Sequence, residues 1–165
     1  MTFADVVRWM EQSWLGVAGR DVFWVFPLAE IFHFFGLCLL IGSMLFIDLR
    51  LLGFARRVPL QSVLAFIPAA AIGLVINTLT GIVFLCTYPE NYWPSTAFRI
   101  KLIAIGIGVA NALWFKWMEA PRVALLPQDA DPDRRTKLAA VLSLFVWAVV
   151  IILGRFLPYV SKSTS

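Results

Sequence analysis

Four long apolar stretches follow one another along the chain, separated by short polar segments. They run from about Val22 to Ile47, Leu60 to Cys86, Ala97 to Met118 and Leu138 to Leu157. Each is long enough to cross a bilayer as a helix, which takes roughly 20 predominantly apolar residues. Backbone groups in hydrocarbon must bond internally, and the alternation typical of a membrane barrel is absent. The pattern therefore predicts an all-α integral membrane four-helix bundle.

The segment before the first stretch has a different pattern. From Thr2 to Gly16, apolar residues recur on one side of a helix, and Trp9 and Trp14 are residue types that favour the membrane–water interface. We expect a short amphipathic helix lying on the membrane surface. The acidic residues Asp5 and Glu11 and the long apolar run that follows are not typical of a secretory signal.

Composition supports a membrane protein without a soluble domain. Hydrophobic residues make up 61% of the chain and charged residues 15%, whereas soluble domains have about 45–50% and about 25%. The connections between the apolar stretches are short, so we expect residues 1–165 to form a single membrane domain. We therefore expect the lipid bilayer to be the main environment of this domain.

Basic residues are distributed unevenly over the connections. Those after the first and third stretches hold Arg50, Arg56, Arg57, Lys116, Arg122, Arg134, Arg135 and Lys137. The connection from Thr87 to Thr96 holds none. The positive-inside rule then places both termini outside, which is the periplasm if the membrane is a bacterial inner membrane. The residues that count against this orientation are Arg8, Arg20, Arg99, Lys101, Arg155 and Lys162. No groove of basic and aromatic residues indicates nucleic-acid binding.

Several local features refine the predicted bundle. Pro68 lies inside the second stretch and should kink it. Asp131 or Asp133 could cap the last helix. Cys38 and Cys86 should differ in depth by roughly 15–20 Å at 1.5 Å per residue, too far for a disulfide. Small residues four apart should let helices approach closely; these pairs are Ala69 and Gly73, Ala104 and Gly108, and Gly106 and Ala110.

Ionisable residues inside membrane helices are costly, so each is a candidate for function. Glu30 and His33 lie within the first stretch and share a helix face at a spacing of three. With the predicted topology, further polar side chains fall in the same outer half of the bundle. They are Asn77, Thr78, Thr80, Arg99, Lys101 and Arg155. We expect these residues to line a shared polar cavity.

His33 is the only histidine in the chain. Its imidazole could ligate haem iron or a transition metal, relay protons, or simply be hydrogen-bonded in the interior. Glu30 could orient His33, carry protons, or form a salt bridge with Lys101 or Arg155. A two-iron carboxylate site needs two Glu-x-x-His units, whereas haem needs one protein ligand per side. One histidine per chain therefore favours haem, with oligomerisation or a partner protein.

Other residues receive structural interpretations. Asp48 and Arg50 end the first stretch and should be charges at the membrane boundary that fix its depth. Asn111 and Trp147 should serve packing and hydrogen bonding. No phosphate-binding loop, dinucleotide fingerprint, nucleophile elbow or zinc-protease motif is present, so hydrolase, kinase and nicotinamide-dependent activities receive no support.

Part of the chain resembles a family of small, uncharacterised bacterial four-helix membrane proteins. The resembling segments, within roughly Trp14 to Trp117, are Glu30-Ile-Phe-His33-Phe-Phe-Gly36, Gly42, Asp48-Leu-Arg50-Leu-Leu-Gly53, Thr80-Gly81 and Arg99-Ile-Lys101-Leu102. More distantly, His33 and the Lys101-Leu102 pair are similar to two groups. These are the membrane domain of copper-resistance protein D and the haem-binding protoporphyrinogen oxidase of the HemJ type.

The resemblance implies that His33 is a haem or metal ligand and that Lys101 serves the site or a cofactor propionate. The several His and Met ligands of the copper proteins are missing here, which speaks against copper transport. Three functional hypotheses follow. The first is a membrane-embedded protein that binds b-type haem, or a metal, at His33 and transfers electrons. The second is a transporter, channel or proton-coupled permease component that uses Glu30 and His33. The third is a structural accessory subunit of a membrane complex.

Overall fold

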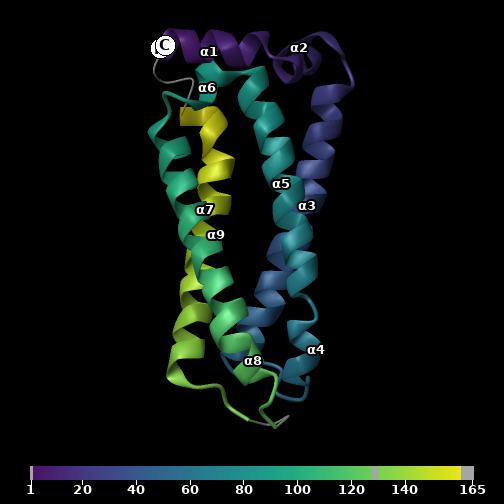
Figure 1. Ribbon diagram of the computed structural model, residues 1–165, viewed down its shortest axis with the longest axis vertical. Helices are drawn as coiled ribbons and strands as arrows, with labels where there is room; N and C mark the ends of the chain where they lie inside the picture. The colour runs from purple at the N-terminus through teal and green to yellow at the C-terminus, as the bar shows by residue number, and fades with distance from the viewer. Residues whose placement is uncertain (1, 128–129, 161–165) are drawn as a thin grey trace.

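Four helical units of membrane-crossing length stand side by side in the computed structural model, which describes residues 2–127 and 130–160 (Figure 1). They are α3 (Val25–Leu51), α4 with α5 (Leu60–Leu64 and Ile67–Thr87), α7 with the π-helical turn η1 and α8 (Thr96–Trp114, Phe115–Glu119 and Ala120–Val123), and α9 (Arg134–Val160). The predicted all-α membrane bundle is confirmed. The first and third units extend four and five residues beyond their predicted ends at Ile47 and Met118.

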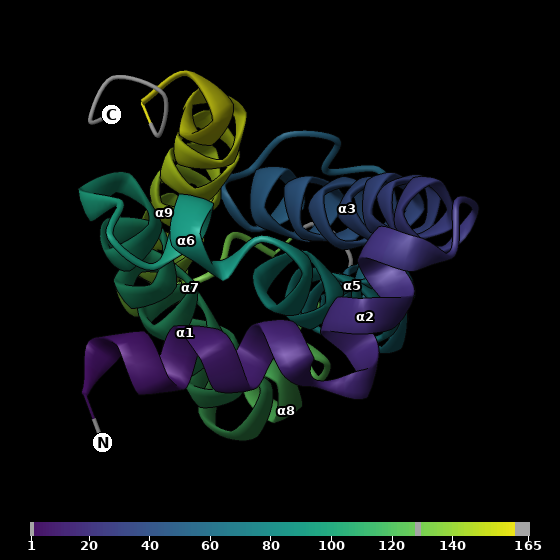
Figure 2. The ribbon, with the colours of Figure 1, turned by 90° about the horizontal axis from the view of Figure 1, so that it is seen from above.

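Two short helices cover one end of the bundle, here called the upper end (Figures 1 and 2). They are α1 (Phe3–Gln12) and α2 (Trp14–Asp21), so the single predicted amphipathic helix is divided at Ser13. Ser13 has an extended backbone, and its hydroxyl accepts a bond from the Gly16 N–H, which caps α2. Trp9 and Trp14 are 64% and 80% exposed, as residues at a membrane interface should be.

Glycines hold α2 against the upper end of α5. A Cβ on Gly16 would lie 2.7 Å from the carbonyl oxygen of Cys86, and one on Gly19 would overlap the Thr87 side chain. Arg20 donates one bond to the Thr87 carbonyl at 3.1 Å and another to the Glu11 carbonyl. The surface helices are therefore fixed to the bundle by close backbone packing and by one arginine.

Prolines interrupt two of the membrane-crossing units. Helix α4 ends at Leu64, and α5 starts at Ile67 with Pro68 in its first turn. The expected kink at Pro68 is thus a break between two helices. Pro121 stands at the start of α8, directly after the π-helical turn Phe115–Glu119. Because proline has no N–H, the backbone before it must find other hydrogen bonds, and a π-helical turn provides them.

Helix α3 packs chiefly on α5, and α7 packs chiefly on α9, while α3 also contacts α9. Little direct contact joins α5 to α7 in the described part of the chain. The α3–α5 crossing is formed by Gly36 and Gly73, since a Cβ on Gly73 would lie 2.7 Å from the Gly36 carbonyl oxygen. At the α7–α9 crossing, Gly108 faces the indole ring of Trp147. The predicted close approach holds at Gly73 and Gly108, whereas Gly106 and Ala110 are exposed.

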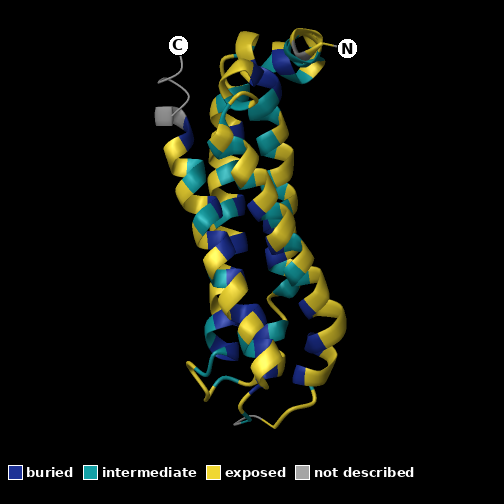
Figure 3. Cartoon of the chain, turned by 90° about the vertical axis from the view of Figure 1, so that its left-hand side faces the viewer, coloured by how far each residue is buried: buried dark blue, intermediate teal, exposed yellow. Residues whose placement is uncertain are grey.

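The apolar core is concentrated at the middle of the bundle and at its lower end, where α4 and α8 lie (Figure 3). Ile47, Leu51, Val63 and Val123 are at most 2% exposed there. Near the upper end, the buried residues of the membrane-crossing helices are fewer and smaller, and Ala29 and Gly36 are examples. The upper half of the bundle is therefore the less tightly packed part.

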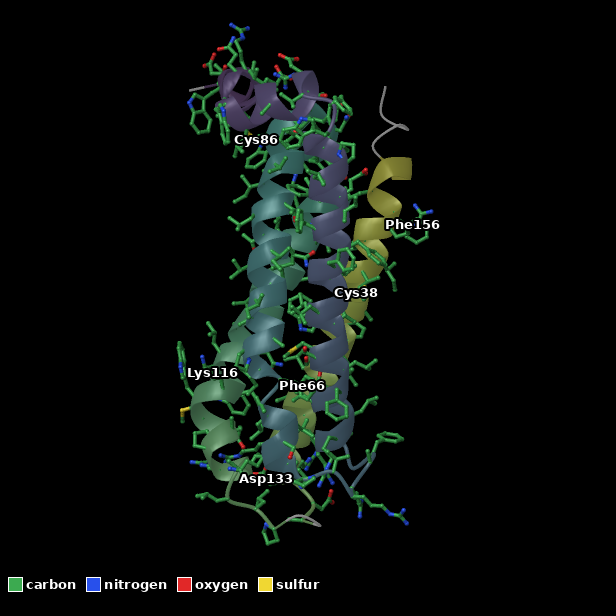
Figure 4. All side chains as sticks on the ribbon, turned by 90° about the vertical axis from the view of Figure 1, so that its right-hand side faces the viewer. Cys38, Phe66, Cys86, Lys116, Asp133 and Phe156 are labelled. Carbon is green, nitrogen blue, oxygen red and sulfur yellow. The ribbon has the colours of Figure 1, made fainter. Side chains whose placement is uncertain are left out.

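The lower end contains the cap of the last helix. The Asp133 carboxylate accepts bonds from the Thr136 backbone N–H at 2.9 Å and from the Thr136 hydroxyl at 2.8 Å, and these bonds hold the pKa of Asp133 below its ordinary value. The predicted cap at Asp133 is confirmed by these bonds, and Figure 4 shows the residue at the lower end of the bundle. Figure 4 also places Cys38 near mid-bundle and Cys86 at the upper end, and both are free cysteines, as predicted.

Candidate functional site

A hydrogen bond joins His33 of α3 to Thr80 of α5 in the upper half of the bundle. The two atoms, His33 Nδ1 and Thr80 Oγ1, are 2.7 Å apart. The Thr80 hydroxyl also lies 2.8 Å from the Ile76 carbonyl oxygen, and when it donates there its oxygen accepts from His33 Nδ1–H. In that arrangement the neutral imidazole carries its proton on Nδ1, and Nε2 keeps a lone pair. The contact ties the orientation of the imidazole ring to the α3–α5 helix pair.

The surroundings of His33 combine aromatic and cationic groups. Its half-buried ring lies 5.1 Å from the ring of Phe84, centroid to centroid. Lys101 of α7 is close enough for its charge to act on His33. The ammonium of Lys101 also lies beside Gly154 of α9, where a Cβ would be 3.3 Å from Nζ. We call this region the His33 site. Helices α3, α5, α7 and α9, one from each membrane-crossing unit, contribute to it.

Glu30 lies one turn above His33 and is exposed. It forms no ion pair with any residue that the structure describes, so the expected salt bridge with Lys101 or Arg155 does not occur in this structure. Tyr92 of α6 (Pro89–Tyr92) is close to it: burial raises the pKa of the Tyr92 phenol, and the charge of Glu30 adds to the increase. Tyr92 was missed because it lies in a connection with no periodic pattern.

The other polar residues predicted for the cavity are placed differently. Asn77 donates to the Gly73 carbonyl at 3.0 Å and serves the α3–α5 crossing. Thr78 is exposed and donates to the Leu74 carbonyl at 2.8 Å. Arg99 and Arg155 are also exposed, and Arg99 donates to the Pro94 carbonyl at 3.1 Å. The structure thus brings His33, Thr80 and Lys101 together and leaves Thr78 and Arg99 on exposed faces.

Asp48 and Arg50, which we expected to be charges at the membrane boundary, are buried within the bundle at the lower end of α3. Their exposed fractions are 5% and 1%. Arg50 donates to the Val58 carbonyl at 2.7 Å and so fixes the connection that follows α3. Asp48 faces α9, where the Ser143 hydroxyl bonds to its carboxylate. The physical reason is that α3 continues to Leu51 and the connection folds back over its end.

The donor set limits which cofactors the His33 site could hold. The described residues contain no group of three or more His, Cys, Asp or Glu side chains that could hold a metal ion. His33 therefore offers one imidazole nitrogen, with the Thr80 hydroxyl bonded to its other nitrogen and the charge of Lys101 nearby. Such a set fits haem, whose iron needs one protein ligand and whose propionates need cations.

No protein-family model, curated protein or solved structure matches this chain. These comparisons give no support to a relationship with the copper-resistance protein D membrane domain or with the HemJ-type oxidase.

Proposed function

We propose that this chain is a membrane protein that binds b-type haem through His33 and takes part in electron transfer. The observation that supports this function best is the 2.7 Å contact between His33 Nδ1 and Thr80 Oγ1. Histidines that ligate metals commonly donate the other ring N–H to an oxygen, which fixes the tautomer and strengthens the ligand. The same arrangement leaves His33 Nε2 as the atom for iron.

The neighbouring residues would serve such a cofactor. Lys101 supplies a cation for a carboxylate of the ligand, and Phe84 supplies an aromatic surface beside the imidazole. Bound haem would supply a one-electron redox centre, while the apolar bundle excludes water from it. What this chain itself does is to orient the ring, hold the proton on Nδ1 and balance the negative charge of the cofactor.

The proposal includes a partner that would supply any further ligand to the haem. The chain offers one histidine, so a second histidine would come from another copy of the chain in a homo-oligomer, or the partner would be another membrane or periplasmic protein. Phe34 and Phe35, which directly follow the histidine in α3, are each 63% exposed. They provide an apolar surface next to the site on which a partner helix could pack.

The experiment is a reduced-minus-oxidised absorption spectrum of the purified protein in mild detergent, after expression with haem supplied. The proposed function requires a band in the b-haem region in stoichiometric amount. A protein that shows no such band would overturn the haem proposal and leave the His33 site to be tested for proton or ion movement.

A second candidate is a transporter, channel or proton-coupled permease component. It is favoured by the Glu30 carboxylate, which is free of ion pairs with the described residues, lies one turn from His33 and acts on Tyr92. We expect, if this function is correct, that Glu30→Gln abolishes a pH-dependent flux in liposomes, because glutamine cannot exchange a proton. Flux equal to that of the wild type would exclude Glu30. Full function of both Glu30→Gln and His33→Ala would leave a structural accessory subunit.

We further propose that the membrane is the bacterial inner membrane and that the upper end of the bundle faces the periplasm. The basic residues of the lower-end connections support this orientation through the positive-inside rule. The basic residues that count against this orientation lie in the upper half of the bundle, namely Arg8, Arg20, Arg99, Lys101 and Arg155. Lys162, which also counts against it, lies outside the described residues.

Site-directed labelling tests the orientation. In a background with Cys38→Ala and Cys86→Ala, we expect Asn91→Cys to react with a membrane-impermeant maleimide in intact spheroplasts. Leu125→Cys, which is 87% exposed as leucine in the turn after α8, should react only after the membrane is opened. The reverse pattern of labelling would place the lower end outside.

A further inference from the structure

A second polar region lies in the lower half of the bundle and has no role in the proposed function. A cavity of about 130 Å³ opens there between all four membrane-crossing units. Its wall is mostly aliphatic, with Leu40, Met44 and Ala70 among its members. Five polar side chains also line it, namely Asp48, Asn111, Lys116, Ser143 and Trp147; of these, Lys116 is exposed, whereas Asp48, Ser143 and Trp147 are buried. None of the residues that line this cavity belongs to the His33 site.

Two polar atoms in the wall are buried without a hydrogen-bond partner. They are Asp48 Oδ2 and Trp147 Nε1, in side chains that are each only 5% exposed. Ser143 bonds to the Asp48 carboxylate but leaves Oδ2 unpartnered. Asp48 also forms no ion pair with a described residue. A buried carboxyl group of this kind inside a membrane bundle either takes up a proton or needs a cation or a strong donor beside it, and a bound cation would favour its ionised form.

We infer that this cavity is a binding site for a small organic amine whose ammonium group binds Asp48 and whose body is apolar. The ammonium donates to Asp48 Oδ2. The aliphatic wall accommodates the hydrocarbon part. An engineered cavity of roughly 150 Å³ holds benzene, so a volume of about 130 Å³ suits a body of about one ring.

The way into the cavity runs between α5 and α7. Three residues that line the cavity are also exposed on the surface. They are Ala71 of α5 and Leu113 and Lys116 of the third unit. These helices make little direct contact with one another, so no tight seam closes the entrance. A lipophilic amine dissolved in the bilayer can therefore reach Asp48 from the side.

The test uses 4-fluorobenzylamine as the probe, with the intact protein in lipid nanodiscs and fluorine NMR as the readout. We expect saturable binding of the amine and none of 4-fluorotoluene, which has the same ring without the charge. Asp48→Asn keeps the shape of the side chain and should weaken the Kd for the amine about tenfold or more.

Two variants on α5 keep the test decisive even if the Asp48→Asn protein misfolds. Ala71→Phe should abolish binding because it fills the entrance, whereas Ile72→Phe should bind like the wild type because Ile72 is exposed but does not line the cavity. The inference is overturned if the wild type binds no amine saturably, if the uncharged probe binds equally well, or if Asp48→Asn and Ala71→Phe both bind like the wild type.

Discussion

Replacement of His33 by alanine is expected to remove the haem absorption band completely. His33 is the only histidine in the chain, and because Nδ1 is in contact with Thr80, Nε2 is the nitrogen that we propose for iron. Alanine has no group that could replace it as a ligand. The measurement is the reduced-minus-oxidised spectrum per mole of purified protein, compared between the wild type and His33→Ala at the same folded yield.

Thr80→Val is the matched variant for this prediction. Valine has nearly the shape of threonine but cannot accept the bond from His33 Nδ1–H, so it should retain the band while changing the midpoint potential or the haem affinity. Loss of a second-shell partner typically costs 10–100-fold in affinity or activity. A band that persists unchanged in His33→Ala would show that iron is bound elsewhere and would refute ligation by His33.

Gly73→Ala should be the most damaging single-methyl change in the membrane-crossing helices. A Cβ at Gly73 would lie 2.5 Å from the backbone nitrogen of Leu40 and 2.7 Å from the carbonyl oxygen of Gly36. Both contacts are with backbone atoms, which cannot rotate away, so α3 and α5 must separate. Overpacking of this kind typically costs about 1–3 kcal/mol and sometimes more, and the gain in helix propensity offsets at most about 1 kcal/mol.

The same helix offers a control, because a Cβ at Gly81 would meet no atom within 4 Å. Gly81→Ala should therefore leave the free energy of unfolding unchanged or raise it slightly. Reversible unfolding by sodium dodecyl sulfate, followed by circular dichroism, measures both variants. The α3–α5 crossing would have been misplaced if Gly73→Ala proved as stable as Gly81→Ala. Separation of the two helices should also move Thr80 away from His33.

Features that depend on neighbouring residues along the chain could be predicted from the sequence. The four apolar stretches, the cap at Asp133 and the interruption at Pro68 all arise from local composition and local hydrogen bonding. Membrane helices are especially predictable because hydrocarbon forces each one to satisfy its own backbone. The pairing of Glu30 with His33 on one face also follows from helical spacing alone.

Contacts between helices could not be predicted in the same way. The sequence grouped eight polar residues into one cavity by depth, but depth does not give the rotation of each helix about its axis. Rotation places Thr80 next to His33 and turns Thr78, only two residues away, to an exposed face. It also brings Lys101 beside Gly154.

That this is a four-helix membrane protein follows from the amino-acid sequence alone, because the bilayer dictates the length and composition of each segment. Which polar side chains meet depends on how the helices pack, because close contacts at a few glycines set the rotation and spacing of the helices. Asp48 shows the difference most clearly. At the end of an apolar stretch it has the pattern of a boundary charge, yet the continuation of α3 and the position of α9 bury it beside a cavity.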